Sequence, residues 1–174
     1  MIVDDTKIGG SISVWTVSLW LMAIFLSIFL ISCGESRTIS TSVEFVSYGC
    51  KKLALSAPFT DDDIDVLLEH AQQKAEEHGI PIYVEKELLV TPLFNPRVAE
   101  GKIIILFAFN QDVLDEYMAL KEFKRRAVEE GRLEEDEEEI AWRFGRLLSY
   151  TDEAIERLQA ENKDSFHSTL SLRF

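Results

Sequence analysis

The most constraining feature of this sequence is an uncharged apolar run near its N-terminus. Residues 11–33 form 23 consecutive positions without Asp, Glu, Lys or Arg. As an α-helix that rises about 1.5 Å per residue, such a run spans roughly 34 Å, enough to cross a hydrocarbon core of about 30 Å. A helix that is apolar all round needs partners on every side, and one small domain cannot supply them. The run therefore predicts insertion into a membrane.

The last residues of the run indicate how the anchor is made. The tetrapeptide Leu-Ile-Ser-Cys that ends at Cys33 resembles the lipobox of bacterial lipoprotein precursors. The resemblance implies a signal peptide cleaved before Cys33, and palmitate-type acyl chains on that cysteine. Its recognition residues would be Leu30, Ile31 and Ser32. Two or three chains make a stable lipid anchor, because each buried methylene contributes about 0.8 kcal/mol. This interpretation locates the protein in the bacterial cell envelope, on the extracytoplasmic side of its membrane.

A permanent transmembrane helix is the alternative. The residues before the run include Asp4, Asp5 and Lys7, whereas a signal peptide begins with a net positive region. The run is also longer than the roughly 7–15 apolar residues of a typical signal peptide. The flanking charges do not fix an orientation, so this alternative includes a single-pass protein whose acidic domain faces the cytoplasm.

The rest of the chain predicts one acidic domain. Residues 1–32 are the signal peptide or transmembrane helix, residues 33–42 suggest a flexible Ser/Thr-rich tether, and residues 43–174 suffice for a single domain with its own core. The net charge of −13 repels phosphates, so we expect no nucleic acid as partner. If Cys33 carries lipid, Cys50 has no cysteine to pair with, and we expect it in a half-buried strand.

Hydrophobic periodicity predicts an α+β fold. We expect about three strands in a small, mostly antiparallel sheet, packed with about four helices and preceded by the N-terminal hydrophobic helix. Residues 102–109 are apolar on both alternating faces, which is typical of a central strand covered on both sides. Its predicted partner is the segment 82–90, including a strand at 88–90. Further strands are expected at 43–48, with a continuation at 52–55, and at 169–174.

Capping signals predict the helices. Thr60 is the expected N-cap of a helix that stops at His78, and Asn110 caps a helix over residues 111–129. Gly131 separates this helix from another over residues 134–148, and a short helix follows Tyr150. The C-terminal third of the domain is therefore helical.

No motif in the sequence predicts an enzyme. There is no glycine-rich phosphate loop, Gly-x-Ser-x-Gly elbow, Cys-x-x-Cys or His-Glu-x-x-His. His70 and His78 lie about 12 Å apart along one predicted helix, too far for both to bind one zinc. We therefore expect no catalytic residue, no metal and no cofactor, without ruling out an enzyme.

Two features support a role in protein interaction. Glu134, Glu135 and Asp136 begin a run of six acids at a predicted helix N-terminus, suited to a basic partner. Trp142 falls off the apolar face of the same helix and is the expected interface anchor. Nearby bases are expected to pair with the acids within the chain: Lys121, Lys124, Arg125, Arg126 and Arg132.

Three functions therefore stand open. The favoured hypothesis is a membrane-tethered interaction or assembly module, with another envelope protein as its partner. The second is a membrane-anchored small-molecule binder or enzyme whose site lies in the loop 92–101. The third is the single-pass protein with a cytoplasmic domain. A deep pocket beside residues 92–101 would favour the second, and an exposed apolar patch around Trp142 would favour the first.

Overall fold

The computed structural model describes residues 37–61, 64–94 and 96–170, which belong to one compact unit that begins at Glu35. The apolar run and the lipobox residues, Leu30 to Cys33, lie outside the described residues, so their roles stay predictions. Among the helices that are described, none has the length and apolar character needed to cross a membrane.

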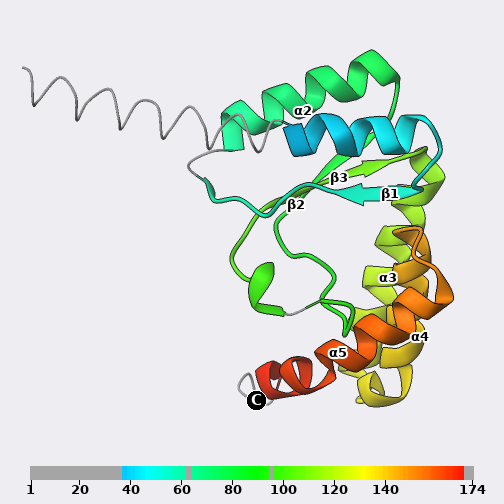
Figure 1. Ribbon diagram of the computed structural model, residues 1–174. Helices are drawn as coiled ribbons and strands as arrows, with labels where there is room; N and C mark the ends of the chain where they lie inside the picture. Colours follow the sequence, from blue (N-terminus) through cyan, green and yellow to red (C-terminus); the bar gives the residue numbers. More distant parts are fainter. Residues whose placement is uncertain (1–36, 62–63, 95, 171–174) are drawn as a thin grey trace, which may run out of the picture. The chain divides into compact units, whose positions relative to one another are not determined.

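A three-stranded antiparallel sheet lies between two layers of helices (Figure 1). Its strands, in spatial order, are β1 (Leu53–Leu55), β3 (Ile104–Ala108) and β2 (Ile82–Glu85). A helix over residues 37–47 and α2 (Ile64–His78) lie on one side. The other side carries α3 (Gln111–Glu129), α4 (Leu133–Leu147) and α5 (Asp152–Leu170). The predicted α+β class and the antiparallel three-stranded sheet are confirmed.

The central strand β3 supplies both hydrophobic clusters of the domain. All five of its residues are apolar and buried, as predicted for a strand covered on both faces. Because strand side chains alternate, Ile105 and Phe107 face the opposite side from Ile104 and Leu106. We call the cluster on the side of α2 the α2 layer; it includes Ile39, Val43, Val46, Leu67, Ala71, Ile105 and Phe107. We call the cluster on the side of α3 the α3 layer; it includes Leu53, Leu89, Leu93, Ile104, Leu106, Leu114, Tyr117, Leu120, Phe144 and Ile155.

The predicted ends of α2 at His78 and of α3 at Glu129 are confirmed, whereas the predicted start of α2 after Thr60 involves residues 62 and 63, which lie outside the described residues. The side chain of Asn110 accepts a hydrogen bond of 3.1 Å from the backbone N–H of Val113 and thereby caps α3. The chain leaves α2 and α3 through Gly79 and Gly131, whose φ angles of +66° and +70° favour glycine. These caps place α3 and α4 against each other in the C-terminal third of the chain.

The prediction for residues 37–48 was wrong. Residues 37–42 were expected in a flexible tether and residues 43–48 in a strand, but residues 37–47 form one helix. Ile39, Val43 and Val46 recur at helical spacing and are 2%, 0% and 0% exposed in the α2 layer. Cys50 was expected in a half-buried strand; it is exposed in the turn after this helix. Counting this helix, the described residues form five helices where about four were expected.

Two further strand predictions were wrong. Residues 88–90 form no strand and have irregular backbone. Leu88 and Leu89 are nevertheless buried, 9% and 3% exposed, because their side chains pack into the α3 layer. Thr169 and Leu170, expected at the start of a final strand, lie in α5, which is longer than the predicted short helix.

Candidate functional site

A groove of about 800 Å³ lies between α3 and the chain that leads from β2 to β3. One wall comes from residues 86–90 and 99–101, and the other comes from α3 between Met118 and Glu129. The volume falls in the range of roughly 300–1,000 Å³ that is usual for ligand pockets. Its apolar lining comes from both walls: Leu88, Leu89, Val90, Ala99, Met118 and Val128.

The charged side chains of the groove balance one another. Four are basic (Lys86, Lys121, Lys124 and Arg125) and four are acidic (Glu87, Glu100, Glu122 and Glu129). The Arg125 guanidinium bonds Glu122 and Glu129 on its own helix. The groove therefore joins an apolar lining to polar groups without net charge, although the whole chain carries −13.

Glu85 is the buried charge beside the groove. It ends β2 opposite Ile104, so its side chain points toward α3, and it is 3% exposed. Its carboxylate accepts hydrogen bonds from the Tyr117 hydroxyl at 2.8 Å and from Lys121 Nζ at 2.7 Å. A third bond comes from the backbone N–H of Glu87 at 2.8 Å. These donors compensate the loss of water around the buried carboxylate.

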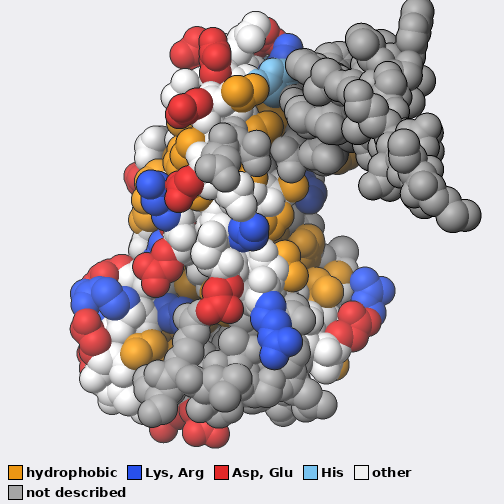
Figure 2. Space-filling view, turned by 90° about the vertical axis from the view of Figure 1, so that its left-hand side faces the viewer, with side chains coloured by type: hydrophobic (Ala, Val, Ile, Leu, Met, Phe, Trp, Pro, Cys, Tyr) orange, Lys and Arg blue, Asp and Glu red, His pale blue; other side chains and the backbone are white. Residues whose placement is uncertain are grey.

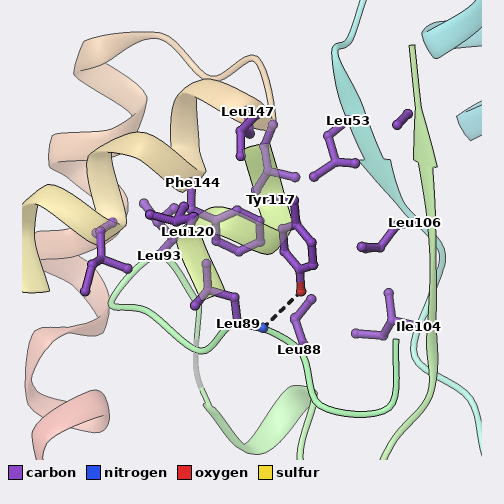
Figure 3. Packing of buried hydrophobic residues seen from close by; sticks show 14 of the residues in the cluster. Leu53, Leu88, Leu89, Leu93, Ile104, Leu106, Tyr117, Leu120, Phe144 and Leu147 are labelled. Carbon is purple, nitrogen blue, oxygen red and sulfur yellow. Dashed lines mark hydrogen bonds between the residues drawn. The ribbon is translucent and has the colours of Figure 1, made fainter. Parts of the chain in front are cut away.

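The Tyr117 hydroxyl links Glu85 to the loop. It donates to the Glu85 carboxylate and accepts a hydrogen bond of 3.3 Å from the backbone N–H of Leu89 (Figure 3). Burial of the ring, followed by the negative charge of Glu85, raises the pKa of Tyr117 above its usual range. The hydroxyl therefore stays protonated near neutral pH, which suits a structural bond and not a general base.

Two lysines of α3 hold the loop backbone. Lys121 Nζ donates to the carbonyl of Glu87 at 2.8 Å in addition to its ion pair with Glu85. Lys124 Nζ donates to the carbonyl of Val90. We call Glu85, Tyr117, Lys121 and Lys124, with the backbone that they bind, the loop brace. Because the amines bind carbonyls of residues 87–90, this segment stays in place although it belongs to no strand.

The surface of the domain carries both signs of charge. Figure 2 shows acidic and basic side chains interspersed with separate hydrophobic areas on the face that it presents. Several charged side chains pair with a partner on their own helix, such as Lys74 with Glu77 and Arg143 with Glu139. Exposed pairs of this kind contribute little to stability and do not define a site.

Trp142, the expected interface anchor, is not freely exposed. Its ring is partly buried against the α3 layer, and the Arg146 guanidinium lies over it, 5.3 Å from the ring centre. Glu134 and Glu135 are exposed in the first turn of α4, while Asp136 pairs with Arg132. Glu135 and Trp142 are seven residues apart and therefore lie on the same side of α4, about 10 Å apart along its axis, whereas Asp136 is turned to another side.

The predicted loop 92–101 is divided between core and groove. Pro92 and Leu93 are buried, and Leu93 belongs to the α3 layer. Ala99, Glu100 and Gly101 line the groove. The sequence thus located part of one wall, but it did not indicate Glu85. The expected pairing of bases with the acids of α4 holds for Arg132, whereas Lys121 bonds Glu85 and Arg125 bonds acids of α3.

The two histidines whose side chains are described, His70 and His78, form no common site. His70 Nε2 lies 3.3 Å from the Ser40 hydroxyl, which belongs to the helix over residues 37–47, and His78 is exposed at the end of α2. Within the described part of the chain, no three His, Cys, Asp or Glu side chains are grouped as metal ligands. Among the described residues, the groove and its loop brace are therefore the best-formed candidate site.

Comparison with known proteins adds no further assignment. No protein-family model, no curated protein and no solved structure matches this chain.

Proposed function

We propose that this protein is a membrane-anchored, non-catalytic binding module of the bacterial cell envelope, and that its groove takes up a small, largely apolar ligand. The observation that carries the ligand part is the groove of about 800 Å³ between α3 and residues 86–101. The anchor part rests on the uncharged run of residues 11–33 and on the lipobox that ends at Cys33.

The lining of the groove favours this kind of ligand. Leu88, Leu89 and Met118 offer apolar surface, and burial of apolar area contributes about 25 cal/mol per Å². The amines of Lys121 and Lys124 are bonded to the carbonyls of Glu87 and Val90, so these two amines are already engaged within the protein. A ligand without a formal charge would have only a small desolvation cost when it enters such a groove.

The loop brace supports binding more than catalysis. A general base needs a pKa near the working pH, and the hydroxyl of Tyr117 is shifted the other way. Glu85 and Lys121 neutralise each other within hydrogen-bond distance. Partner docking through Trp142, the role first favoured by the sequence, has weaker support because that ring is partly buried against the α3 layer and the Arg146 guanidinium lies over it.

The anchor is tested by metabolic labelling with a clickable fatty acid. The wild-type protein should incorporate the label, and Cys33→Ser should lose it completely. Cys50→Ser is the matched control, since it removes the other cysteine of the chain, and it should stay labelled. Label that persists in Cys33→Ser would overturn the lipid anchor and leave the transmembrane alternative.

The groove is tested with a photoreactive 12-carbon alcohol on the full chain in lipid nanodiscs. Mass spectrometry should find labelled peptides from residues 86–101 and 118–129, and excess dodecanol should compete with the label. Val128→Trp fills the groove from a residue that is 44% exposed and should abolish this labelling. Val66→Trp is the control, because Val66 is an exposed helical valine outside the groove. Labelling that does not saturate, or that is equal in both variants, would contradict the proposal.

A further inference from the structure

Three exposed aromatic side chains lie at one end of the sheet. Phe45, Tyr48 and Phe109 are 47%, 76% and 49% exposed. Phe45 and Tyr48 are three residues apart where the helix over residues 37–47 ends, so they point to the same side. Phe109 directly follows β3. Single exposed apolar side chains are common on protein surfaces, but a cluster of them often marks an interaction site.

Backbone bonds bring these residues together. The N–H of Phe109 donates to the carbonyl of Lys52 at 2.8 Å, and the N–H of Lys51 donates to the carbonyl of Phe45 at 3.0 Å. A Cβ added to Gly49 would lie 3.9 Å from Cε2 of the Phe109 ring. In Figure 1 the end of the helix over residues 37–47 and the arrowhead of β3 lie on the same side of the domain. We call Phe45, Tyr48 and Phe109 the aromatic end.

The charge near the aromatic end differs from that of the whole chain. Residues 43–52 contain two lysines, Lys51 and Lys52, and one acid, Glu44, and residues 109–112 add one acid, Asp112, so these two segments together carry no net charge. The chain as a whole carries −13. Aromatic rings beside lysines are typical of positions at the level of lipid headgroups, where the ring is half-buried and the amine reaches water or phosphate.

The distance along the chain to the expected anchor is short. The apolar run ends at residue 33, and the chain is already helical at residue 37. Four residues reach at most about 14 Å when fully extended. The helix then advances about 16 Å from residue 37 to residue 48. A domain held on so short a connection stays within reach of the bilayer surface.

We infer that the aromatic end docks on the bilayer interface, with Phe45, Tyr48 and Phe109 among the lipid headgroups. This inference rests on the membrane anchoring in the proposed function, but it does not depend on the groove. A lipid surface is the occupant that the short connection and the Lys–aromatic composition favour. The contact would restrict how the anchored domain turns above the membrane.

Cys50 offers a native probe of this contact, because it is exposed in the turn between Tyr48 and Lys51. The full chain is reconstituted in phosphatidylcholine vesicles, labelled with a nitroxide, and tested for collisions with oxygen and with a water-soluble nickel chelate. Cys50→Ser labelled in the same way measures any signal from Cys33. Val66→Cys in the Cys50→Ser background reports an exposed position on α2.

We expect the nickel chelate to reach position 50 several-fold less than position 66, while oxygen still reaches it. Joint substitution Phe45→Ser and Tyr48→Ser should raise nickel access at position 50 to the value at position 66. Serines at Val66 and Val98, two other exposed apolar positions, should leave it unchanged.

Failure of the docking and failure of the anchor give different results. A chain that does not float with the vesicles overturns both the anchor and the docking. A chain that floats while position 50 is open to nickel overturns the docking alone. Protection of position 50 from both oxygen and nickel would indicate a protein partner or a second copy on the aromatic end, and would overturn the lipid assignment.

Discussion

The two layers of helices on the sheet differ in what they bury. Among the described residues, the α2 layer contains no buried charged side chain, and it is formed by aliphatic and aromatic groups such as Val43 and Phe107. The α3 layer also has a large apolar core, but Glu85 and the Tyr117 hydroxyl are buried at its edge. The groove opens beside this second layer.

The difference indicates that the α2 layer serves stability alone, whereas the α3 layer also forms the candidate site. An apolar layer needs only shape and volume to be stable. A buried carboxylate must be desolvated, and its hydrogen bonds and ion pair offset this cost only when their geometry is good. Here Tyr117 and Lys121 supply that geometry, and they also hold the irregular segment that forms a wall of the groove.

The largest expected effect tests the apolar layer. Phe107 is fully buried in the α2 layer, and Phe107→Ala should lower the free energy of unfolding by about 3–5 kcal/mol. Urea denaturation of the full chain, followed by circular dichroism, measures this loss. Saturable labelling in the groove should persist under native conditions. Loss of groove labelling in a variant that is still folded would show that the two layers are not separate in function.

The next effect tests the loop brace. Lys121→Met keeps the aliphatic stem but removes the amine from the buried carboxylate of Glu85, which should lower the free energy of unfolding by about 2 kcal/mol. Hydrogen exchange should also accelerate in residues 86–90. Arg125→Met is the control, because it removes two exposed ion pairs of the same helix and should leave the urea midpoint nearly unchanged. Equal effects of both variants would contradict the brace.

A smaller effect tests the packing of α4 on α5. A Cβ at Gly145 would lie 2.6 Å from Cγ1 of Ile155, closer than side chains tolerate. Gly145→Ala should therefore destabilise the domain by about 1–2 kcal/mol through overpacking. Ile155→Val removes the Cδ1 methyl group, which would lie 2.7 Å from the new Cβ, and should recover part of the loss in the double variant. A stabilised Gly145→Ala chain would show that Ile155 moves aside without cost.

The smallest effect at neutral pH concerns Tyr117. Tyr117→Phe removes two hydrogen bonds and should cost about 1 kcal/mol at pH 7. Because the folded protein raises the pKa of this hydroxyl, its contribution is complete below about pH 10 and is lost as pH rises further, where the unfolded tyrosine ionises. The stability of the wild type should thus fall more steeply than that of Tyr117→Phe between pH 9 and pH 11. Parallel curves in urea titrations would contradict the buried, protonated hydroxyl.

Much of the fold could be predicted from local patterns. The all-apolar alternation of residues 103–109 indicated the central strand, and Asn110 and Gly131 marked the ends of α3. The pattern of Ile39, Val43 and Val46 was also present, but it was outweighed by the Ser/Thr content of residues 38–42 and the β-branched residues that follow. These three side chains can be buried together against the sheet only when the segment is helical, and this burial is a tertiary effect that outweighs local propensity.

The candidate site was harder to predict. The turn-forming residues of the loop 92–101 drew attention to one wall of the groove, because irregular chain often carries binding residues. Glu85 followed three strand residues without any sign that it would be buried, and Lys121 was expected to pair with the acids of α4. Glu85 and Lys121 bind each other although they are 36 positions apart in the sequence, and no local spacing encodes such a contact.

The sequence by itself determined the uncharged run of residues 11–33, the acidic character of the chain, the α+β class and the central place of β3. These follow from composition and from hydrophobic period, which are local properties. Only the tertiary structure decided that residues 37–47 are helical, that Trp142 is partly buried and that Glu85, Tyr117 and Lys121 meet. The reason is physical: whether a side chain is buried, and what compensates its charge there, depends on residues that are distant in the chain.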